Sequence, residues 1–133
     1  MVSFTTIATG LVAIFAFSAL AAPANAFSAT SGDFTHYSPS IGLGACGQLH
    51  QDSELVAAIS YAVFDPKTPG GNPNNNLLCG RRIRANFEGK SVEVIVVDRC
   101  PSCSAGSLDL SPAAFQQLAD LGRGHIQGSW DWI

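Results

Sequence analysis

Positive charge is scarce in this chain of 133 residues. Seven Lys and Arg residues stand against ten Asp and Glu residues, which gives a formal net charge of −3. Proteins that bind nucleic acids or anionic membrane surfaces neutralise phosphates with clustered Lys and Arg side chains. A mildly acidic chain does not supply such a surface, and we expect neither nucleic acid nor a membrane among the partners of the mature protein.

Long hydrophobic runs are absent after residue 26, and nothing there is apolar enough to span a membrane. Before that point the apolar run LVAIFAFSAL leads into AAPANA, which ends in an A-x-A pattern at Ala24 and Ala26. This order is typical of a secretory signal peptide, although the first residues lack the usual positive charge. We expect residues 1–26 to be removed and residues 27–133 to form one secreted, extracellular, monomeric domain.

Cysteine is limited to four residues, Cys46, Cys79, Cys100 and Cys103. An even number in a small secreted domain indicates two disulfides, for which three pairings are possible. We favour Cys46–Cys79 with Cys100–Cys103, the second of which would hold a turn in shape. A zinc site is disfavoured because Cys46 and Cys79 have no C-x-x-C partner, and a redox C-x-x-C would have to open a helix. We expect no metal and no cofactor.

Alternating and continuous apolar patterns predict short strands along the rest of the chain. The apolar segment 55–59 is interpreted as a buried strand that runs into a helical turn over 60–64. The segment EGK predicts a hairpin turn between two further strands. The expected strands lie in GDFTHYSP (32–39), 55–59, CGRRIRANF (79–87), KSVEVIVVD (90–98) and HIQGSWDWI (125–133).

One helix is predicted from the signals at its ends. Ser111 is a typical N-cap, Pro112 suits the first helical position, and Gly122 ends the pattern. Five or six short strands, one helix and long glycine-rich loops indicate a mainly β fold, a small closed barrel. Trp130 and Trp132 share one face of the last strand. Either could stack on a sugar ring, but we expect at least one of them in the barrel core.

An ordered set of short motifs resembles the double-psi β-barrel superfamily. Its elements are Thr35 and Tyr37, GACG (44–47), CG (79–80), DRCPSC (98–103) and LDLSPAAF (108–115). The superfamily includes rare lipoprotein A-like proteins, the first domain of expansins, barwin and inverting endoglucanases of glycoside hydrolase family 45. The match covers nearly all of residues 27–133 and looks most like the single-domain, expansin-like loosenins of fungi. It implies a six-stranded double-psi barrel with one or two short helices, and a fungal source.

The resemblance also implies a site around Asp109. This residue stands where expansins carry the acid of a His-Phe-Asp motif and where the related hydrolases carry their general acid. Thr35 and Tyr37 match the Thr and Tyr that expansins place beside that acid, and Asp98 matches the acid of the Asp-x-Cys-Pro motif. With Trp130 as a stacking ring, these residues form the expected polysaccharide-binding set. Ser107-Leu108 replaces the His-Phe of expansins.

Hydrolysis is not expected at this site. Inverting hydrolysis needs an acid and a base about 6.5–9.5 Å apart with a water between them. Family-45 enzymes carry the base just after the first strand, where this chain has YSPSIGLGACG (37–47) and no carboxylate. Asp98 is a conceivable substitute, but an Asp at the end of a strand more often accepts backbone N–H groups. We therefore expect a binding protein that loosens cellulose, chitin or a related wall glycan without cutting it.

Two other functions remain open. Some single-domain barrels of this superfamily inhibit papain-like cysteine proteases, and barwin-like members act in defence. Such a role would use the exposed loops SPSIGLG (38–44) and DPKTPGGNPNNN (65–76). A glycosidase or lytic transglycosylase is a third alternative, which the missing base disfavours.

Overall fold

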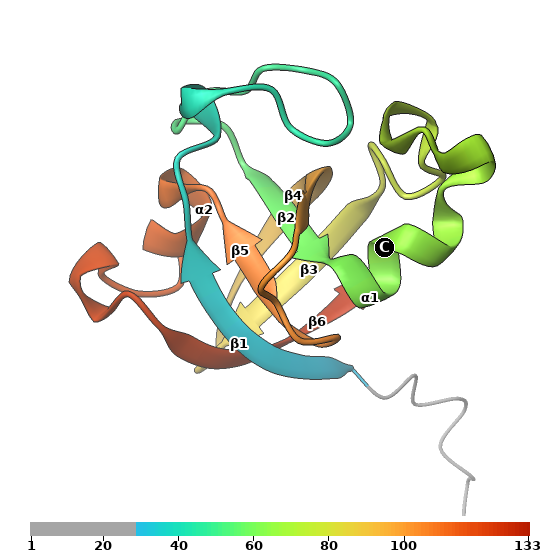
Figure 1. Ribbon diagram of the computed structural model, residues 1–133. Coiled ribbons are helices and arrows are strands. Elements are labelled where there is room, and N and C mark those ends of the chain that lie inside the picture. The colour runs from blue at the N-terminus through green and yellow to red at the C-terminus, as the bar shows by residue number, and fades with distance from the viewer. Residues whose placement is uncertain (1–28) are drawn as a thin grey trace, which may run out of the picture.

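Six strands form a closed barrel in a computed structural model that describes residues 29–133 (Figure 1). Around the barrel the strands follow the order β1-β5-β2-β4-β3-β6, in which β1–β5 and β2–β4 are parallel pairs and the others antiparallel. The signal-peptide prediction lies outside the described residues. The strands are β1 (Thr30–His36), β2 (Val56–Ser60), β3 (Arg82–Phe87), β4 (Lys90–Cys100), β5 (Leu108–Leu110) and β6 (Ile126–Trp132).

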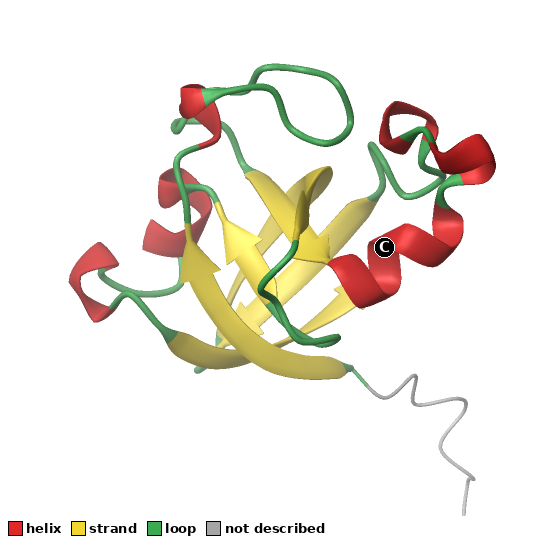
Figure 2. Ribbon diagram, in the orientation of Figure 1, coloured by secondary structure: helices red, strands yellow, loops and turns green. Residues whose placement is uncertain are grey.

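Helices are short and lie in the connections between strands (Figure 2). None within residues 29–133 combines the length and hydropathy that crossing a bilayer requires. The helices are α1 (Tyr61–Phe64), α2 (Pro112–Gln116) and the 3-10 turns Pro39–Ile41, Asp65–Lys67, Pro69–Gly71, Pro73–Asn75 and Leu121–Arg123.

The expected mainly β barrel with six strands and short helices is confirmed. The strand over 55–59 and the turn after it are found at Val56–Ser60 and Tyr61–Phe64. The hairpin between β3 and β4 turns at Glu88 and Gly89, both with positive φ (44° and 79°). Positive φ at both central residues matches the right-handed twist of the two strands.

Two expectations about residues 108–122 need correction. The prediction treats Leu108–Leu110 only as the approach to a helix, whereas these residues form β5, the strand between β1 and β2. The helix begins as expected, because Ser111 Oγ accepts the Ala114 N–H at 3.3 Å. It ends at Gln116 instead of Gly122, and the left-handed residue that follows the next turn is Gly124 (φ 64°).

The barrel interior holds the main hydrophobic core. Phe34, Ile59, Leu108 and Phe115 are fully buried there. Both disulfides have the favoured pairing, Cys46–Cys79 and Cys100–Cys103. Each ties a loop to the barrel, and both loops lie beside the residues expected at the site.

Candidate functional site

Four residues on neighbouring strands form a row across the barrel wall. Thr35 of β1 pairs with Asp109 of β5, Asp109 pairs with Ala58 of β2, and Ala58 pairs with Asp98 of β4. Ala58 packs on the outer side against Tyr37 and the Cys100–Cys103 disulfide, so the row lies on the outer face of the barrel. Adjacent strands are about 4.8 Å apart, which separates the backbones of Asp98 and Asp109 by about 10 Å.

Asp109 is half-buried at the centre of this row. Thr35 Oγ1 donates a hydrogen bond to Asp109 Oδ1 at 3.0 Å. Burial raises the pKa of the Asp109 carboxyl above its ordinary value, and the nearby Asp98 carboxylate adds to the rise. The Thr35 hydrogen bond and the His36 side chain lower the pKa by less. Asp109 can therefore keep a proton at a higher pH than an exposed Asp, and it can donate that proton to a ligand oxygen.

Tyr37 covers the row from the end of β1, where its backbone N–H donates to Leu110 O at 2.9 Å. Burial raises the pKa of its hydroxyl, and the carboxylates of Asp98 and Asp109 raise it further, so the hydroxyl stays protonated. Tyr37 Oη is buried and has no hydrogen-bond partner within the described chain. A buried hydroxyl without a partner leaves a donor that a small movement or a ligand oxygen can satisfy.

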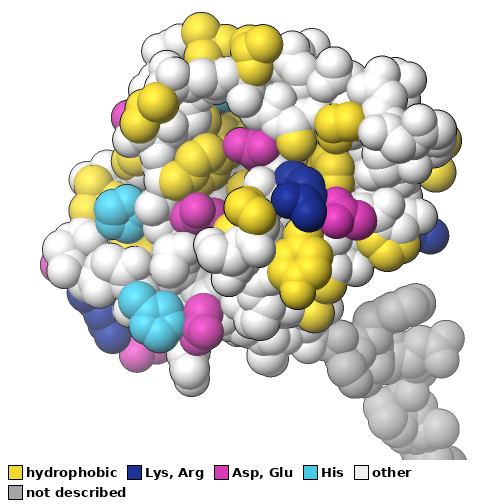
Figure 3. All heavy atoms as spheres, in the orientation of Figure 1, with side chains coloured by type: hydrophobic (Ala, Val, Ile, Leu, Met, Phe, Trp, Pro, Cys, Tyr) yellow, Lys and Arg dark blue, Asp and Glu magenta, His cyan; other side chains and the backbone are white. Residues whose placement is uncertain are grey.

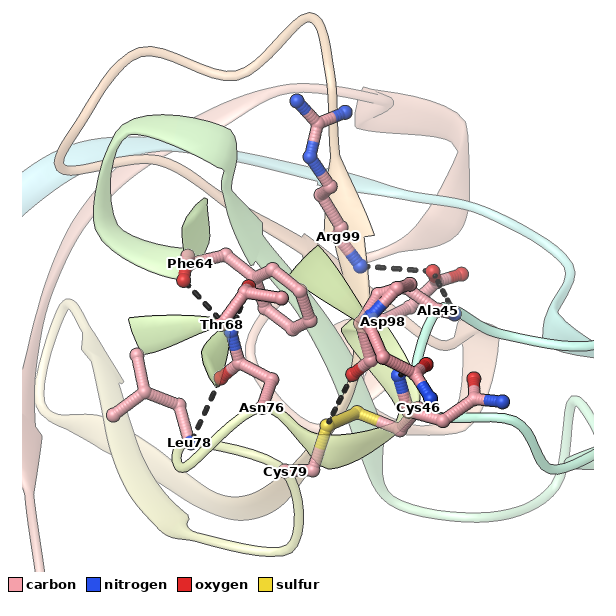
Figure 4. The surroundings of a disulfide bond; sticks show 12 residues. Ala45, Cys46, Phe64, Thr68, Asn76, Leu78, Cys79, Asp98 and Arg99 are labelled. Carbon is pink, nitrogen blue, oxygen red and sulfur yellow. Dashed lines mark hydrogen bonds between the residues drawn. A yellow bond between two sulfur atoms is a disulfide. The ribbon is translucent and has the colours of Figure 1, made fainter. Parts of the chain in front are cut away.

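Asp98 is held by the backbone. Its Oδ1 accepts the Ala45 N–H at 2.7 Å and the Arg99 N–H at 2.8 Å (Figure 4). A bulge in β4 explains its orientation: Val96 pairs with Ala57 and Asp98 with Ala58, and Val97 is the extra residue between them. Bulges commonly redirect a side chain near a functional site. Asp98 thus joins β4 to the loop over 38–49. The expected contacts with backbone N–H groups are present, although the strand continues to Cys100 and Asp98 lies within it and not at its end.

Glycine at position 44 makes this junction possible. A Cβ atom at Gly44 would lie 2.5 Å from Val97 O and 3.3 Å from Asp98 Cγ, closer than a side chain allows. Cys46 N then donates to Val97 O at 3.3 Å, and the Cys46–Cys79 disulfide fixes the loop to the residues before β3 (Figure 4). The loop is therefore a rigid continuation of the barrel wall.

The Cys100–Cys103 disulfide closes the other side of the row. Ser60 Oγ donates to Cys103 O at 2.8 Å, which fixes the turn against the end of β2. Both cysteines are buried, at 5% and 8% exposed, and lie against Ala58 and Tyr37. The C-x-x-C turn is a structural support of the site.

The structure removes Trp130 from the expected ligand surface. Its side chain is 2% exposed, and its indole N–H donates to Gly106 O at 2.9 Å. Trp132 is half-buried and contacts Trp130 edge to face, at 5.2 Å between ring centroids. The last strand must fill the barrel interior, so neither ring offers a free face beside Asp109.

A different aromatic residue lies nearer to the row. Tyr61 directly follows β2 and is 44% exposed. The Arg99 guanidinium lies 5.7 Å from the centre of its ring and donates two hydrogen bonds to Asp65, at 2.6 and 2.8 Å. Figure 3 shows acidic, basic and hydrophobic side chains intermingled on this face. The sequence did not mark Tyr61, since a tyrosine directly after a buried strand carries no signal for ligand binding.

The described chain also has two hollows that are lined by residues outside the row. One hollow is lined by residues of β1, β3 and β6, among them Asp33, Asn86 and Gln127. A second is lined by residues that include Phe64, Thr68 and Arg99. Within residues 29–133 no three His, Cys, Asp or Glu side chains are grouped so that they could hold a metal ion.

Comparisons with known proteins agree with this architecture. Residues 29–130 match the model of a double-psi β-barrel family described as lytic transglycolase. The papain inhibitor of Streptomyces mobaraensis is 40% identical over 106 residues, which cover 77% of this chain and 71% of the relative. An EG45-like domain containing protein of Citrus jambhiri is 31% identical over 111 residues, covering 74% of this chain and 78% of the relative.

Solved structures of related proteins have the same fold. The Streptomyces papain inhibitor has a TM-score of 0.70 at 39% identity, covering 77% of this chain and 92% of the inhibitor. A mutant Clavibacter michiganensis expansin in complex with cellohexaose has a TM-score of 0.63 at 29% identity. That match covers 78% of this chain but half of the expansin chain. The protein therefore belongs to the double-psi β-barrel family, among its rare lipoprotein A-like and expansin-like members.

Proposed function

We propose that this protein is secreted and binds a cell-wall polysaccharide, cellulose, chitin or a related glycan, which it loosens without cutting. The observation that carries the proposal is the difference between the two carboxylates of the row, Asp109 and Asp98. Asp109 is half-buried, with a raised pKa, and can share a proton with a sugar oxygen. Asp98, the other carboxylate of the row, already accepts two backbone N–H groups.

This arrangement favours binding over hydrolysis. Inverting hydrolysis needs a base free to take a proton from water, and the loop that follows β1 carries no carboxylate between residues 37 and 47. The Ala45 and Arg99 N–H groups both donate to Asp98 Oδ1, so the backbone sets the orientation of this carboxylate at the junction with the loop. Binding energy at the row would instead compete with the hydrogen bonds between neighbouring glycan chains. The expansin complex with cellohexaose supports a glycan as the ligand of this fold.

Tyr61 replaces Trp130 as the proposed stacking ring. The apolar C–H face of a pyranose packs on an aromatic face, and the exposed Tyr61 ring, held by Arg99, comes three residues after Ala58 of the row. Thr35 orients the Asp109 carboxyl, and Tyr37 supplies a protonated hydroxyl beside it.

A pull-down on insoluble cellulose and on chitin tests the proposal. Asp109→Asn removes the acid and Tyr61→Ala removes the ring, and we expect each to weaken binding to the preferred glycan by about tenfold. Asp131→Asn, a carboxyl-to-amide change on β6, is the matched control and should bind like wild type. Equal binding by all four proteins would contradict the proposed surface.

A second function is supported by a different observation. The similarity to the papain inhibitor covers most of both chains, whereas the expansin match covers half of the expansin. Inhibition of a papain-like cysteine protease would use the loop over 38–49, whose Ile41 and Leu43 are 87% and 73% exposed. Titration of papain with the wild-type protein tests this function, and full papain activity at saturating protein would exclude it.

A further inference from the structure

Three exposed residues lie at the tip of the loop over 38–49, where the 3-10 turn Pro39–Ile41 ends. Ile41, Gly42 and Leu43 are exposed, and Gly42 is fully extended (φ −172°, ψ 178°). Among the backbone hydrogen bonds outside helices and strands, none is donated by the Leu43 N–H. We call these residues the 41–43 segment.

The segment is held at its upstream end. Pro39 is buried. The Ser40 backbone N–H and hydroxyl both donate to Asp52 Oδ1, at 3.2 and 2.8 Å. The Ser40 hydroxyl hydrogen bond also holds the pKa of the exposed Asp52 below its ordinary value, so Asp52 stays ionised and keeps this contact at neutral pH.

The downstream end is fixed more firmly. Gly44 N donates to Gln48 O at 3.0 Å, Ala45 N donates to Asp98, and Cys46 is bonded to Cys79. The three exposed residues therefore lie between two anchors on the barrel. A segment that is held at both ends loses little conformational entropy when it binds.

The neighbouring loop over 65–77 extends the same surface. It is joined to the first loop by Cys46–Cys79, and Gly47 lies so close to Asn74 that a Cβ would contact the Asn74 side chain at 2.9 Å. Leu77 is 67% exposed. Figure 1 shows both loops at the same end of the barrel, and Figure 3 shows hydrophobic side chains along that edge of the molecule.

We infer that the 41–43 segment enters the substrate-binding cleft of a papain-like cysteine protease. The inference rests on the proposed inhibitor function and names the part of the chain that performs it. A protease cleft takes an extended peptide through backbone hydrogen bonds and side-chain pockets, the manner in which extended peptides are generally recognised. The 41–43 segment offers the Leu43 N–H for such a bond and an extended backbone at Gly42, with Ile41 and Leu43 as apolar anchors on either side of it. Because Gly42 has no Cβ, the enzyme backbone can approach it closely.

Three single variants test the inference by inhibition constant against papain. Ile41→Glu and Leu43→Glu place a charge on each apolar anchor, and Gly42→Val adds bulk between them. Gly42→Val should not disturb the fold, because its extended backbone suits any residue and no atom lies within 4 Å of the new Cβ. We expect each variant to raise the inhibition constant by about tenfold or more.

Ser91→Glu is the control, since it adds the same charge on exposed β4 next to the β3–β4 hairpin, away from both loops. It should keep the wild-type constant to within about twofold. Unfolding midpoints and glycan binding should be the same in all variants. Wild-type inhibition that all three substitutions leave unchanged would overturn the inference but keep the inhibitor function. No inhibition by wild type would refute that function, and the inference with it.

Discussion

The structural role of Asp98 can be measured by comparing Asp98→Ala with Asp98→Asn. Alanine removes two hydrogen bonds from backbone N–H groups to a carboxylate, at 2.7 and 2.8 Å. Bonds to charged groups contribute about 1.5–3 kcal/mol each, and the lower figure applies to a half-exposed group. Removal of Asp98 also relieves its repulsion with Asp109, which offsets part of the loss. We expect Asp98→Ala to lower the free energy of unfolding by about 2–3 kcal/mol.

Asparagine keeps an oxygen that accepts both N–H groups, but as neutral hydrogen bonds, so its cost should be about 1 kcal/mol. Urea unfolding at neutral pH with both disulfides intact gives the two values. Amide hydrogen exchange at Ala45 locates the effect, because this N–H should lose protection in the alanine variant and largely keep it in the asparagine variant. A loss below about 0.5 kcal/mol in Asp98→Ala, with Ala45 still protected, would refute the reasoning. Asp98 would then be free to serve as a base.

Two further predictions concern the pH dependence and the disulfides. Burial raises the Asp109 pKa above 3.8 in the folded state, so folded protein holds a proton that unfolded chain has released. The free energy of unfolding of wild type, relative to that of Asp109→Asn, should therefore fall as the pH rises from 3.8 through the higher pKa of folded Asp109. Urea unfolding from pH 3 to 7 measures both proteins, and a constant difference between their free energies would contradict the raised pKa. The Cys46–Cys79 disulfide joins residues 33 apart and Cys100–Cys103 residues 3 apart. Chain entropy predicts that replacing both cysteines of Cys46–Cys79 with alanine lowers the free energy of unfolding by about 3.7 kcal/mol. The same replacement at Cys100–Cys103 should lower it by about 1.6 kcal/mol. Thermal or urea unfolding checks the order, and a larger loss for Cys100–Cys103 would show that its packing dominates.

Local signals in the sequence predicted several parts of the fold correctly. The hairpin at Glu88 and Gly89, the N-cap at Ser111 and the two disulfides all depend on residues whose chemistry is strong over a short range. Burial of all five residues of β2 likewise follows from its continuous apolar run.

Features set by long-range pairing could not be predicted in the same way. Strand β5 has three residues and precedes a helix cap, so its sequence pattern resembles the approach to a helix. It becomes a strand because β1 and β2 bind it from both sides. Trp130 and Trp132 share a face of the last strand, but only Trp130 is completely buried, because its burial depends on the strands that pack around it in the closed barrel.

The site likewise combines residues that local motifs predicted with a residue that only long-range contacts reveal. The motifs named Thr35, Tyr37, Asp98 and Asp109, and the structure brings all four together on the outer face. Tyr61 was missed because a tyrosine after a strand has no signal of its own. Its contact with Arg99 comes from β4, a strand far from Tyr61 in the sequence.

The release of soluble sugar tests the central claim most directly. Purified protein would be incubated with the glycan that it binds best, and separately with peptidoglycan. Both reducing ends and anhydro-sugar products would then be measured over time for wild type and Asp109→Asn. The account predicts that wild type binds the glycan and releases neither product above the level without protein. Steady product release by wild type that Asp109→Asn abolishes would show that Asp109 has a working partner base, and would contradict the account.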